Sequence, residues 1–343
     1  MTSSAIPVTG KGSLLNTQIQ LTGMPQGKLT REVFRMCEVP MPACGQGQVL
    51  VKVRVISLDA ANRAWMQGAT YRSALEAGQV MAGGAIGEVI ESRADGFVPG
   101  DLVFGDIGWQ SHAVLPAAEL RKVPRIEPIT HLLSVYGIAG LTAYFGLLRV
   151  GQPKPGQTVV VSAAAGSVGS LVGQIAKIQG CRVVGIAGGA AKCDWLLNTL
   201  GFDAAVDYKA GGLSRALKEA APEGIDVYFD NVGGDVFEAC LFRMKQGGRI
   251  ACCGAVSQYD GEPPRHGPRG VPGLIVTKRL TLQGFVLYDF YPEIDTAMKD
   301  LQGWVASGQL KVIEDVRQGL AQVPDALIGL LAGDNYGKRM VVL

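Results

Sequence analysis

The feature that most constrains the fold of this chain is a short apolar strand that runs into a small-residue turn and then a helix. The strand is predicted at 158–162, the turn reads AAAGSVG over 163–169, and the helix is predicted at 167–179. The spacing A-x-x-G-x-x-G has alanine at the first glycine of the dinucleotide-binding fingerprint. Small residues let the backbone approach a pyrophosphate, whose charge the helix N-terminus stabilises. The unit therefore indicates a dinucleotide site; the alternative is a tight strand–helix turn in an α/β protein with another ligand.

Apolar strands and helices alternate after this unit. The predicted strands are 182–186, 204–207, 226–231 and 248–253, with helices at 192–200, at 213–220 and ending near residue 242. This alternation is typical of a parallel, doubly wound sheet. A Pro/Gly-rich loop is expected at 261–273, followed by helices at 293–306 and 325–331 and a strand at 339–343.

The first third of the chain has a different, β-rich pattern. Short strands are predicted at 48–57, 85–92, 102–104 and 112–115, with Gly, Pro and Asp between them. A helix at 132–148 and a linker at 153–156 lead into the α/β part. The length of 343 residues suits about two domains. We therefore expect an α/β protein with a β-rich domain over 1–135, completed by 300–343, and a nucleotide-binding domain over 136–299.

Composition and charge narrow the class of protein. With 48% hydrophobic and 18% charged residues, the chain should fold compactly. A net charge of +2 without a Lys/Arg-rich tract argues against nucleic acid as a partner. The absence of a signal-peptide pattern and of a membrane-length apolar run argues against a membrane, so we expect a cytoplasmic protein. Seven irregularly spaced cysteines are expected to be reduced and mostly buried.

The residues after the second strand favour NADP over NAD. An NAD site uses Asp or Glu about 20 residues beyond the glycines to bind the ribose 2′-hydroxyl. Here VGIAGGAAK (184–192) contains no acid, while Gly188 and Gly189 leave space and Lys192 offers a cation for a 2′-phosphate. The alternative for Lys192 is a solvated helix residue. The predicted cofactor is NADPH/NADP+.

Four runs of sequence resemble one family of oxidoreductases. They are GLTAYFGL (140–147), the segment 154–189, YFDNVGG (228–234) and GDNYGK (333–338). They are similar to the zinc-independent branch of the medium-chain dehydrogenases/reductases, which holds prostaglandin reductases, plant double-bond reductases and bacterial curcumin reductases. The resemblance runs from about residue 50 to 343. It implies a GroES-like β-rich catalytic domain, a Rossmann domain for NADPH, and a homodimer.

The resemblance also implies a set of cofactor contacts. Asn231 follows a strand end, where its amide can reach ribose hydroxyls, and Asn335 would have to fold back from near the C-terminus. Turn-forming asparagines are the alternative for both. The full set is Gly166, Ser167, Val168, Gly169, Gly189, Lys192, Tyr208, Asn231, Cys253, Gly254, Ala255, Ser257, Tyr259, Phe285, Val286, Leu287 and Asn335.

A catalytic metal is not expected. The three histidines are His112, His131 and His266, and MAGG (81–84) stands where zinc-dependent relatives have Gly-His-Glu. Without three plausible ligands there is no Lewis acid to polarise an alcohol oxygen, which disfavours alcohol dehydrogenation.

The remaining chemistry is reduction of the C=C bond of an α,β-unsaturated ketone or aldehyde. Hydride added to the β-carbon creates an enolate, which needs a hydrogen-bond donor. By resemblance, Tyr259 is the first catalytic candidate. It could also position the nicotinamide ribose, whose 2′-hydroxyl would then donate, or merely line the pocket.

Tyr71 is the second catalytic candidate. It follows DAANRAWM (59–66), where curcumin reductases have a similar DPAMRGWM, and Ala60 and Asn62 depart from that pattern. A surface tyrosine is the alternative. In the loop 261–273, Arg265, His266 and Arg269 could attract an acidic substrate or could be solvated charges.

Three functions stay open from the sequence. The first is an NADPH-dependent reductase of enones and enals, with substrates like curcumin or 15-oxoprostaglandins. The second is an NADPH quinone reductase of the same architecture. The third is a non-catalytic NADPH-binding protein, against which the cofactor set and Tyr259 argue.

Overall fold

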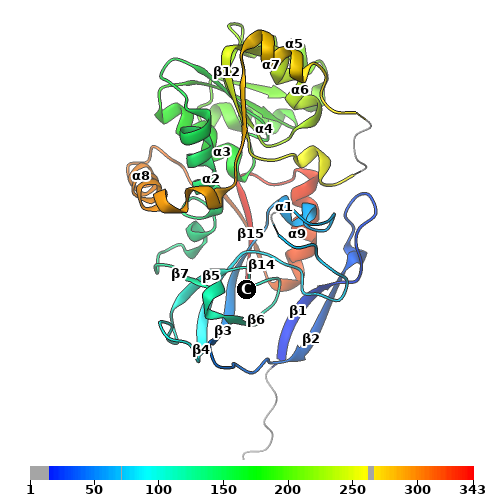
Figure 1. Ribbon diagram of the computed structural model, residues 1–343, viewed down its shortest axis with the longest axis vertical. Coiled ribbons are helices and arrows are strands. Elements are labelled where there is room, and N and C mark those ends of the chain that lie inside the picture. Colours follow the sequence, from blue (N-terminus) through cyan, green and yellow to red (C-terminus); the bar gives the residue numbers. More distant parts are fainter. Residues whose placement is uncertain (1–14, 71, 262–265) are drawn as a thin grey trace, which may run out of the picture.

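The computed structural model describes residues 15–70, 72–261 and 266–343, and it has two domains stacked along the long axis (Figure 1). The lower domain contains the β-rich first third of the chain. The upper domain contains the α/β part, and the C-terminal segment returns to the lower domain. The expected two-domain α/β fold, a GroES-like domain with a Rossmann domain, is confirmed.

The upper domain is built on a parallel sheet. Within the described ranges, six strands lie in the order β10-β9-β8-β11-β12-β13. All neighbouring pairs are parallel. The strands are β8 (Thr158–Val161), β9 (Arg182–Ala187), β10 (Ala204–Asp207), β11 (Ile225–Asp230), β12 (Met244–Cys252) and β13 (Thr281–Gly284).

Helices cover both faces of this sheet because its central strands are apolar on both sides. Val159 and Val161 of β8 belong to one core cluster and Val160 to another. The first cluster takes side chains from α2, α3 and α8, and the second from α5 and α6. The helices are α2 (Ile138–Phe145), α3 (Ser167–Ile178), α4 (Ala190–Asn198), α5 (Leu213–Ala220), α6 (Gly234–Arg243), α7 (Val271–Lys278) and α8 (Ile294–Ala306).

The lower domain is a mixed, mostly antiparallel sheet. In the described part of the chain it has seven strands, in the order β14-β15-β3-β4-β5-β7 with β6 paired to β3. Its strands are β3 (Gln48–Ser57), β4 (Ala85–Ser92), β5 (Leu102–Gly105), β6 (His112–Pro116), β7 (Arg121–Lys122), β14 (Glu314–Gln318) and β15 (Lys338–Val342). The pair β1 (Leu15–Leu21) and β2 (Phe34–Pro40) forms a separate antiparallel sheet.

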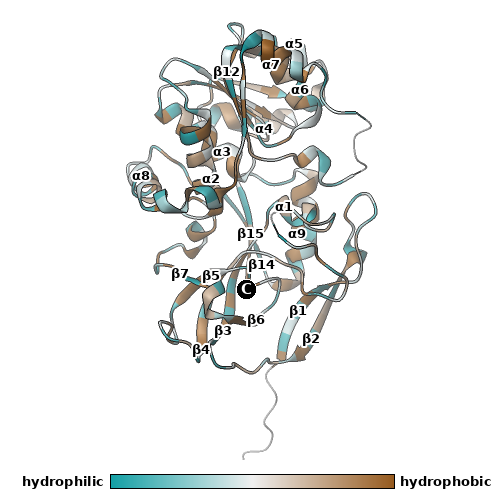
Figure 2. Ribbon diagram, in the orientation of Figure 1, coloured by the Kyte–Doolittle hydropathy of each residue, from teal (hydrophilic) through white to brown (hydrophobic). Residues whose placement is uncertain are grey.

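Alternation along β3 gives this domain its core. Val49, Val51 and Val53 are buried in one cluster, while the intervening Lys52 and Arg54 are exposed. The α-helices of this part include α1 (Ala61–Ala64) and α9 (Val323–Ala332). Figure 2 shows hydrophobic and hydrophilic residues side by side along strands and helices, as expected for amphipathic elements. Among the described helices, none is both long and apolar enough to span a bilayer.

The C-terminal segment links the two domains. Leu301 of α8 packs in the core of the upper domain, and Leu327 of α9 packs in the core of the lower one. The chain then passes the nucleotide turn, where Gly337 N–H donates to Ala165 O at 2.9 Å, and enters β15. The proposed boundary at residue 300 therefore falls inside α8, and the domain limits stay a prediction.

Two sequence predictions were wrong in detail. A continuous helix at 132–148 was expected, but a 3-10 turn (Ile129–Leu132), α2 and a π-helical turn (Gly146–Gly151) are separate pieces. The break falls at Gly137, whose extended backbone (φ −115°, ψ −153°) directly precedes α2, and a Cβ there would lie 2.3 Å from Leu132 O. The loop 261–273 also ends early, because α7 begins at Val271. Strands β1, β2, β7, β13 and β14 are not among the predicted strands.

Candidate functional site

A cleft of about 570 Å³ lies at the carboxyl ends of the parallel strands, with walls from both domains. Strand β8 has β9 on one side and β11 on the other, so the sheet order switches there. Ligands of doubly wound sheets bind at such a switch point. The walls come from the turn after β8, the ends of β9 and β11, the end of α9 with Asn335, residues 58–60, and Val256, Ser257 and Asp260.

The turn after β8 is shaped for close approach of a ligand. Ala163 has a φ of 47°, and Gly166 N–H donates to Ala163 O at 2.9 Å. A Cβ on Gly169 would lie 2.3 Å from the same oxygen, so this position requires glycine. Of the predicted cofactor residues, this turn contributes Gly166, Ser167, Val168 and Gly169 to the cleft wall. The buried Ser167 Oγ has no hydrogen-bond partner in the described structure, which leaves it for a ligand.

Lys192 and Tyr208 line the cleft beyond the end of β9. Lys192 Nζ donates to Gly333 O at 2.7 Å and lies 5.3 Å from the ring centre of Tyr336. Burial, and then repulsion by Lys209, lowers the pKa of Lys192. A cation is thus held at this end of the cleft.

Gly189 is held by an acid that the sequence reasoning overlooked. Asp207, at the end of β10, accepts from the N–H groups of Gly189 (2.8 Å) and Lys209 (2.9 Å). These backbone donors lower the pKa of Asp207, that of Gly189 contributing most. The carboxylate therefore serves the turn between β9 and α4. Asp207 is not expected from the dinucleotide pattern, because it lies at the end of β10, one strand beyond the position where that pattern places an acid.

Asn231 and its neighbour Asp230 connect the strand ends under the cleft. Asn231 lines the cleft, and its Nδ2 donates to Ser162 O at 2.8 Å. The buried Asp230 carboxylate accepts from Tyr228 Oη at 2.6 Å and Ser162 Oγ at 3.1 Å. It also accepts from the N–H of Val232 and of Gly233, each at 3.0 Å. Asn231 is one of the predicted cofactor residues, whereas Asp230 is not among them.

The segment after β12 carries the predicted residues Cys253, Gly254, Ala255, Ser257 and Tyr259. The N–H groups of Cys253 and Gly254 donate to Asp230 O at 2.8 and 3.1 Å, which anchors the segment to β11. Ser257 lines the cleft with Val256 and Asp260. The Tyr259 side chain turns back over its own segment, where Ala255 N–H donates to Tyr259 Oη at 3.1 Å.

Phe285, Val286 and Leu287 lie apart from the cleft walls. Phe285 packs edge-on against Phe229, with ring centres 6.1 Å apart, and against Phe290 at 6.3 Å. A Cβ on Gly146 would lie 2.2 Å from the Phe285 ring. The aromatic packing of Phe285 explains its position without a ligand.

Asn335 reaches the cleft from the C-terminal segment, as the fold-back prediction required. It is buried, and its Nδ2 donates to Gly337 O at 2.8 Å. Tyr71 and Arg265 lie outside the described residues. Arg269 pairs with Glu238 of α6, with Nη2 and Oε1 2.6 Å apart, and does not line the cleft.

The lower domain supplies cleft residues that the sequence reasoning did not assign. Leu58, Asp59 and Ala60 follow β3 and line the wall. The Asp59 carboxylate accepts from Ser57 Oγ at 2.6 Å and pairs with the buried Lys338 Nζ. Ala60 and Asn62 differ from the curcumin-reductase pattern in this segment, but no feature of the local sequence indicates that the segment faces the cleft.

The cysteines are free thiols in this structure. Burial, with the nearby Asp230 carboxylate, raises the pKa of Cys252 to about 11 and that of Cys253 to about 12. Both thiols are therefore protonated near neutral pH and poor nucleophiles. Among the described residues, no three His, Cys, Asp or Glu side chains gather as a metal site would require.

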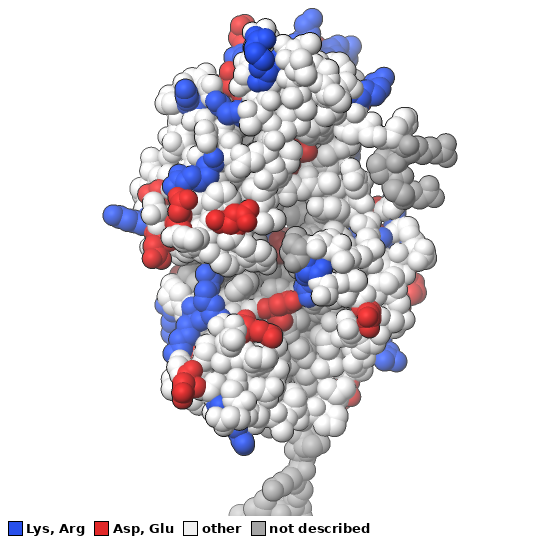
Figure 3. Space-filling view, viewed as in Figure 1, with Lys and Arg blue, Asp and Glu red and all other residues white. Residues whose placement is uncertain are grey.

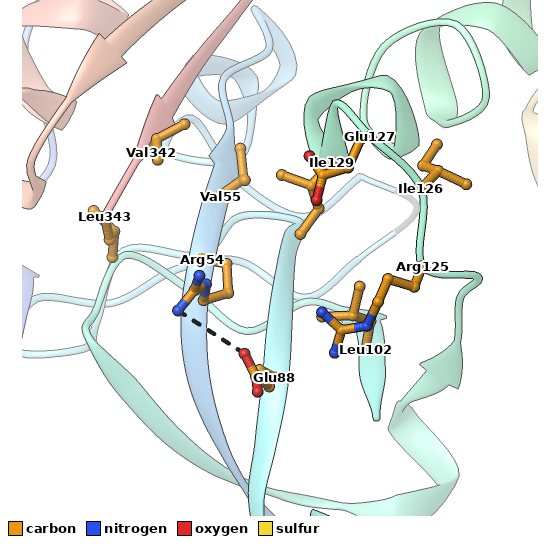
Figure 4. A pocket seen from close by; sticks show the side chains of 10 residues that line it. All are labelled: Arg54, Val55, Glu88, Leu102, Arg125, Ile126, Glu127, Ile129, Val342 and Leu343. Carbon is orange, nitrogen blue, oxygen red and sulfur yellow. Dashed lines mark ion pairs between the residues drawn. The ribbon is translucent and has the colours of Figure 1, made fainter. Parts of the chain in front are cut away.

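A second, smaller cavity of about 200 Å³ lies in the lower domain (Figure 4). It is enclosed by Arg54 and Val55 of β3, Glu88 of β4, and the segment 125–129. Arg54 Nη1 and Glu88 Oε2 are 3.9 Å apart, a loose ion pair. None of its walls is shared with the larger cleft. Figure 3 shows basic and acidic residues interspersed over the visible face.

Comparison with known proteins identifies the family. Residues 17–123 match the family model described as the N-terminal domain of oxidoreductase, and residues 167–303 match the model described as zinc-binding dehydrogenase. Prostaglandin reductase 1 of Bos taurus is 42% identical over 92% of this chain and 95% of its own length. The NADPH-dependent curcumin reductase of Escherichia coli (strain K12) is 39% identical over 97% of this chain and 98% of its own.

A solved structure has the same fold throughout. The crystal structure of CurA in complex with NADPH from Vibrio vulnificus superposes with a TM-score of 0.90 at 39% identity, covering 95% of this chain and 98% of that one. The predicted family and fold are thus confirmed, and NADPH, the predicted nucleotide, is named for the Escherichia coli relative and bound in the Vibrio vulnificus structure. The chain belongs to the medium-chain dehydrogenase/reductase family of oxidoreductases, in the group that contains the prostaglandin and curcumin reductases.

Proposed function

We propose that this protein reduces the C=C bond of α,β-unsaturated ketones and aldehydes with NADPH, with substrates like curcumin or 15-oxoprostaglandins. The observation that carries this proposal is one cleft that joins the turn Gly166–Gly169, the cation of Lys192 and walls from the lower domain. The names of the relatives, a prostaglandin reductase and a curcumin reductase, support the substrate class.

The residues of the cleft suit NADP. The unpartnered Ser167 Oγ and the start of α3 offer donors for a pyrophosphate, and Gly169 leaves room where any side chain would collide with the turn. Lys192 and Tyr208 would hold the 2′-phosphate, and Asn231 and Asn335 the ribose groups. When bound, NADPH supplies a hydride to the β-carbon of the substrate.

Tyr259 is the proposed donor to the enolate oxygen. Its Oη already accepts a hydrogen bond from Ala255 N–H, so its own proton is available to donate. Donation goes either to the substrate oxygen or to the nicotinamide ribose. Tyr71, the second candidate, stays a prediction.

A substrate panel tests the function directly. Purified protein with NADPH should oxidise the cofactor in the presence of medium-chain enones, enals or a diarylheptanoid and yield the saturated carbonyl compound. Much faster turnover of quinones would favour a quinone reductase. Tight NADPH binding with no turnover of any compound would favour a non-catalytic binding protein.

Replacing Tyr259 tests the donor. Tyr259→Phe should lower kcat by roughly 10²-fold or more, because the oxyanion loses a donor, while the Kd for NADPH stays nearly unchanged. Stopped-flow absorbance and fluorescence titration measure the two quantities. Tyr136→Phe, which removes a phenol away from the cleft, is the matched control. An unchanged kcat in Tyr259→Phe would remove this residue from the mechanism.

We also propose that the protein is a homodimer. Strand β13 is the edge of the parallel sheet, and its residues are mostly exposed, which suits pairing with a second copy. Light scattering after size exclusion tests this. The predicted cytoplasmic location, and the prediction that neither nucleic acid nor a membrane is a partner, stay predictions.

A further inference from the structure

The segment 254–260 belongs to the upper domain but ends on a residue held by the lower domain. Its last residue, Asp260, lines the cleft. Asp260 Oδ1 accepts from Leu29 N–H at 2.6 Å and from Arg63 Nε at 3.0 Å. Arg63 is part of α1, directly after the residues 58–60 that form the opposite wall. The ion pair therefore crosses between the domains beside the cleft.

The pair is largely withdrawn from water. The side chain of Arg63 is 2% exposed and that of Asp260 is 19% exposed. Arg63 Nη2 donates to Gly27 O at 2.7 Å, and Nη1 has no partner in the described structure. A guanidinium buried in this way depends on its carboxylate, because a neutral partner would leave the charge uncompensated. Asp260 is therefore held in one place by Arg63.

A second contact from the lower domain reaches the same segment. Gln67 Nε2 donates to Gln258 O at 3.1 Å and to Tyr259 O at 3.0 Å. From the other side, the N–H groups of Val256 and Ser257 donate to the carbonyls of Asn231 and Val232. The backbone of Tyr259 is thus fixed between the residues that follow β11 on one side and α1 with the turn after it on the other.

We infer that Arg63 and Asp260 are positioning residues that fix Tyr259 beside the cleft, so that the lower domain affects the reduction through the segment 254–260. The inference rests on the proposed function, in which Tyr259 donates to the enolate. Neither residue needs to contact substrate for this role. Their effect on kcat should therefore depend on the Tyr259 hydroxyl.

A double-mutant cycle tests that dependence. Asp260→Asn should lower kcat for an enone by about 10- to 100-fold, because a displaced donor loses its alignment. The same change in a Tyr259→Phe background should lower kcat little further, because the group being positioned is already gone. Equal losses in both backgrounds would overturn the inference. Asp325→Asn, which breaks an exposed pair with Arg31, is the matched control and should keep wild-type kcat.

Two further measurements separate positioning from loss of folding. Gln67→Ala alters an exposed side chain and should lower kcat by about threefold without lowering Tm. In Asp260→Asn, amide hydrogen exchange should accelerate in 254–260 and stay unchanged in β8. If the wild-type protein reduces no enone, the proposed function fails. The rate of amide exchange in 254–260 then still shows whether Asp260 holds this segment in place. Unchanged exchange in 254–260 would overturn the inference even in an active enzyme.

Discussion

Lys192 shows how one side chain can combine a structural contact with selection of a ligand. Its ammonium group is fixed by Gly333 O and the face of Tyr336, so it is held in place before a phosphate arrives. Because it is partly buried, it loses some hydration in advance, and its pKa is lowered. A phosphate bound at this end of the cleft would stabilise the ammonium charge of Lys192 in place of the lost water.

Lys192→Ala should therefore weaken NADPH binding more than NADH binding, by roughly 1–3 kcal/mol. The charge-assisted contact to the 2′-phosphate is lost, whereas NADH never made it. Fluorescence titrations with both nucleotides measure the difference. If NADPH and NADH binding are weakened equally, Lys192 supports the fold of the site and does not bind the 2′-phosphate.

The same preference should depend on pH. A lysine with a lowered pKa becomes neutral as pH rises through that value, earlier than an ordinary lysine would. Selectivity for NADPH over NADH should accordingly decline on the alkaline side. In Lys192→Arg it should persist, because a guanidinium stays charged. A flat profile in the wild-type protein would contradict this account.

Residues with a local motif could be predicted from the sequence, and residues defined by distant contacts could not. Lys192 and Asn231 follow strand ends in recognisable patterns, and both line the cleft. Asp260 and Arg63 are 197 positions apart, and nothing near either residue indicates the other. Tyr259 was named by resemblance, but its bond to Ala255 N–H became visible only in the structure.

At the scale of elements, the turn after β8 is controlled by backbone crowding. Ala163 O points at Gly169, so that α3 can begin immediately beside the strand. This arrangement places the first turn of the helix at the cleft. It also makes position 169 intolerant of any side chain.

Gly169→Ala should destabilise the protein by roughly 1–3 kcal/mol and weaken NADPH binding, since backbone atoms must move to admit the methyl group. Gly303→Ala is the control, because that glycine lies inside α8 with open space around its Cβ position. It should raise stability by up to about 1 kcal/mol through better helix propensity. Urea unfolding followed by circular dichroism compares the two; equal effects of both would reject the crowding argument.

Elements were predictable where one pattern dominated. Strands β3 and β4 have strong alternation or β-branched content, and their predicted limits coincide with the observed ones. Strand β1, LNTQIQL, carries polar residues on both faces and was missed. The helix expected at 132–148 is interrupted at Gly137, whose extended backbone the hydrophobic pattern of this stretch does not indicate.

At the scale of the whole molecule, the cleft joins both domains, so a ligand there should stabilise them together. Saturating NADPH should raise the unfolding free energy by about 2.7 kcal/mol at a hundredfold excess over Kd. Calorimetry should show both domains shifting to higher temperature. Lys192→Ala should show a smaller shift at the same NADPH concentration. Movement of the Rossmann transition alone would mean that the lower domain is not coupled to the site.

The last strand of the chain has a consequence for how the protein is made. Strand β15 pairs with β3, and Met340 lies opposite Ser57. The lower domain therefore cannot complete its sheet until β15 has left the ribosome, although most of its strands are synthesised before the upper domain. Pairings between such distant segments are slow to form and leave strand edges open meanwhile. The edge of β3 that β15 covers therefore stays open to other polypeptides during synthesis, whereas β4 and β6 pair with β3 early.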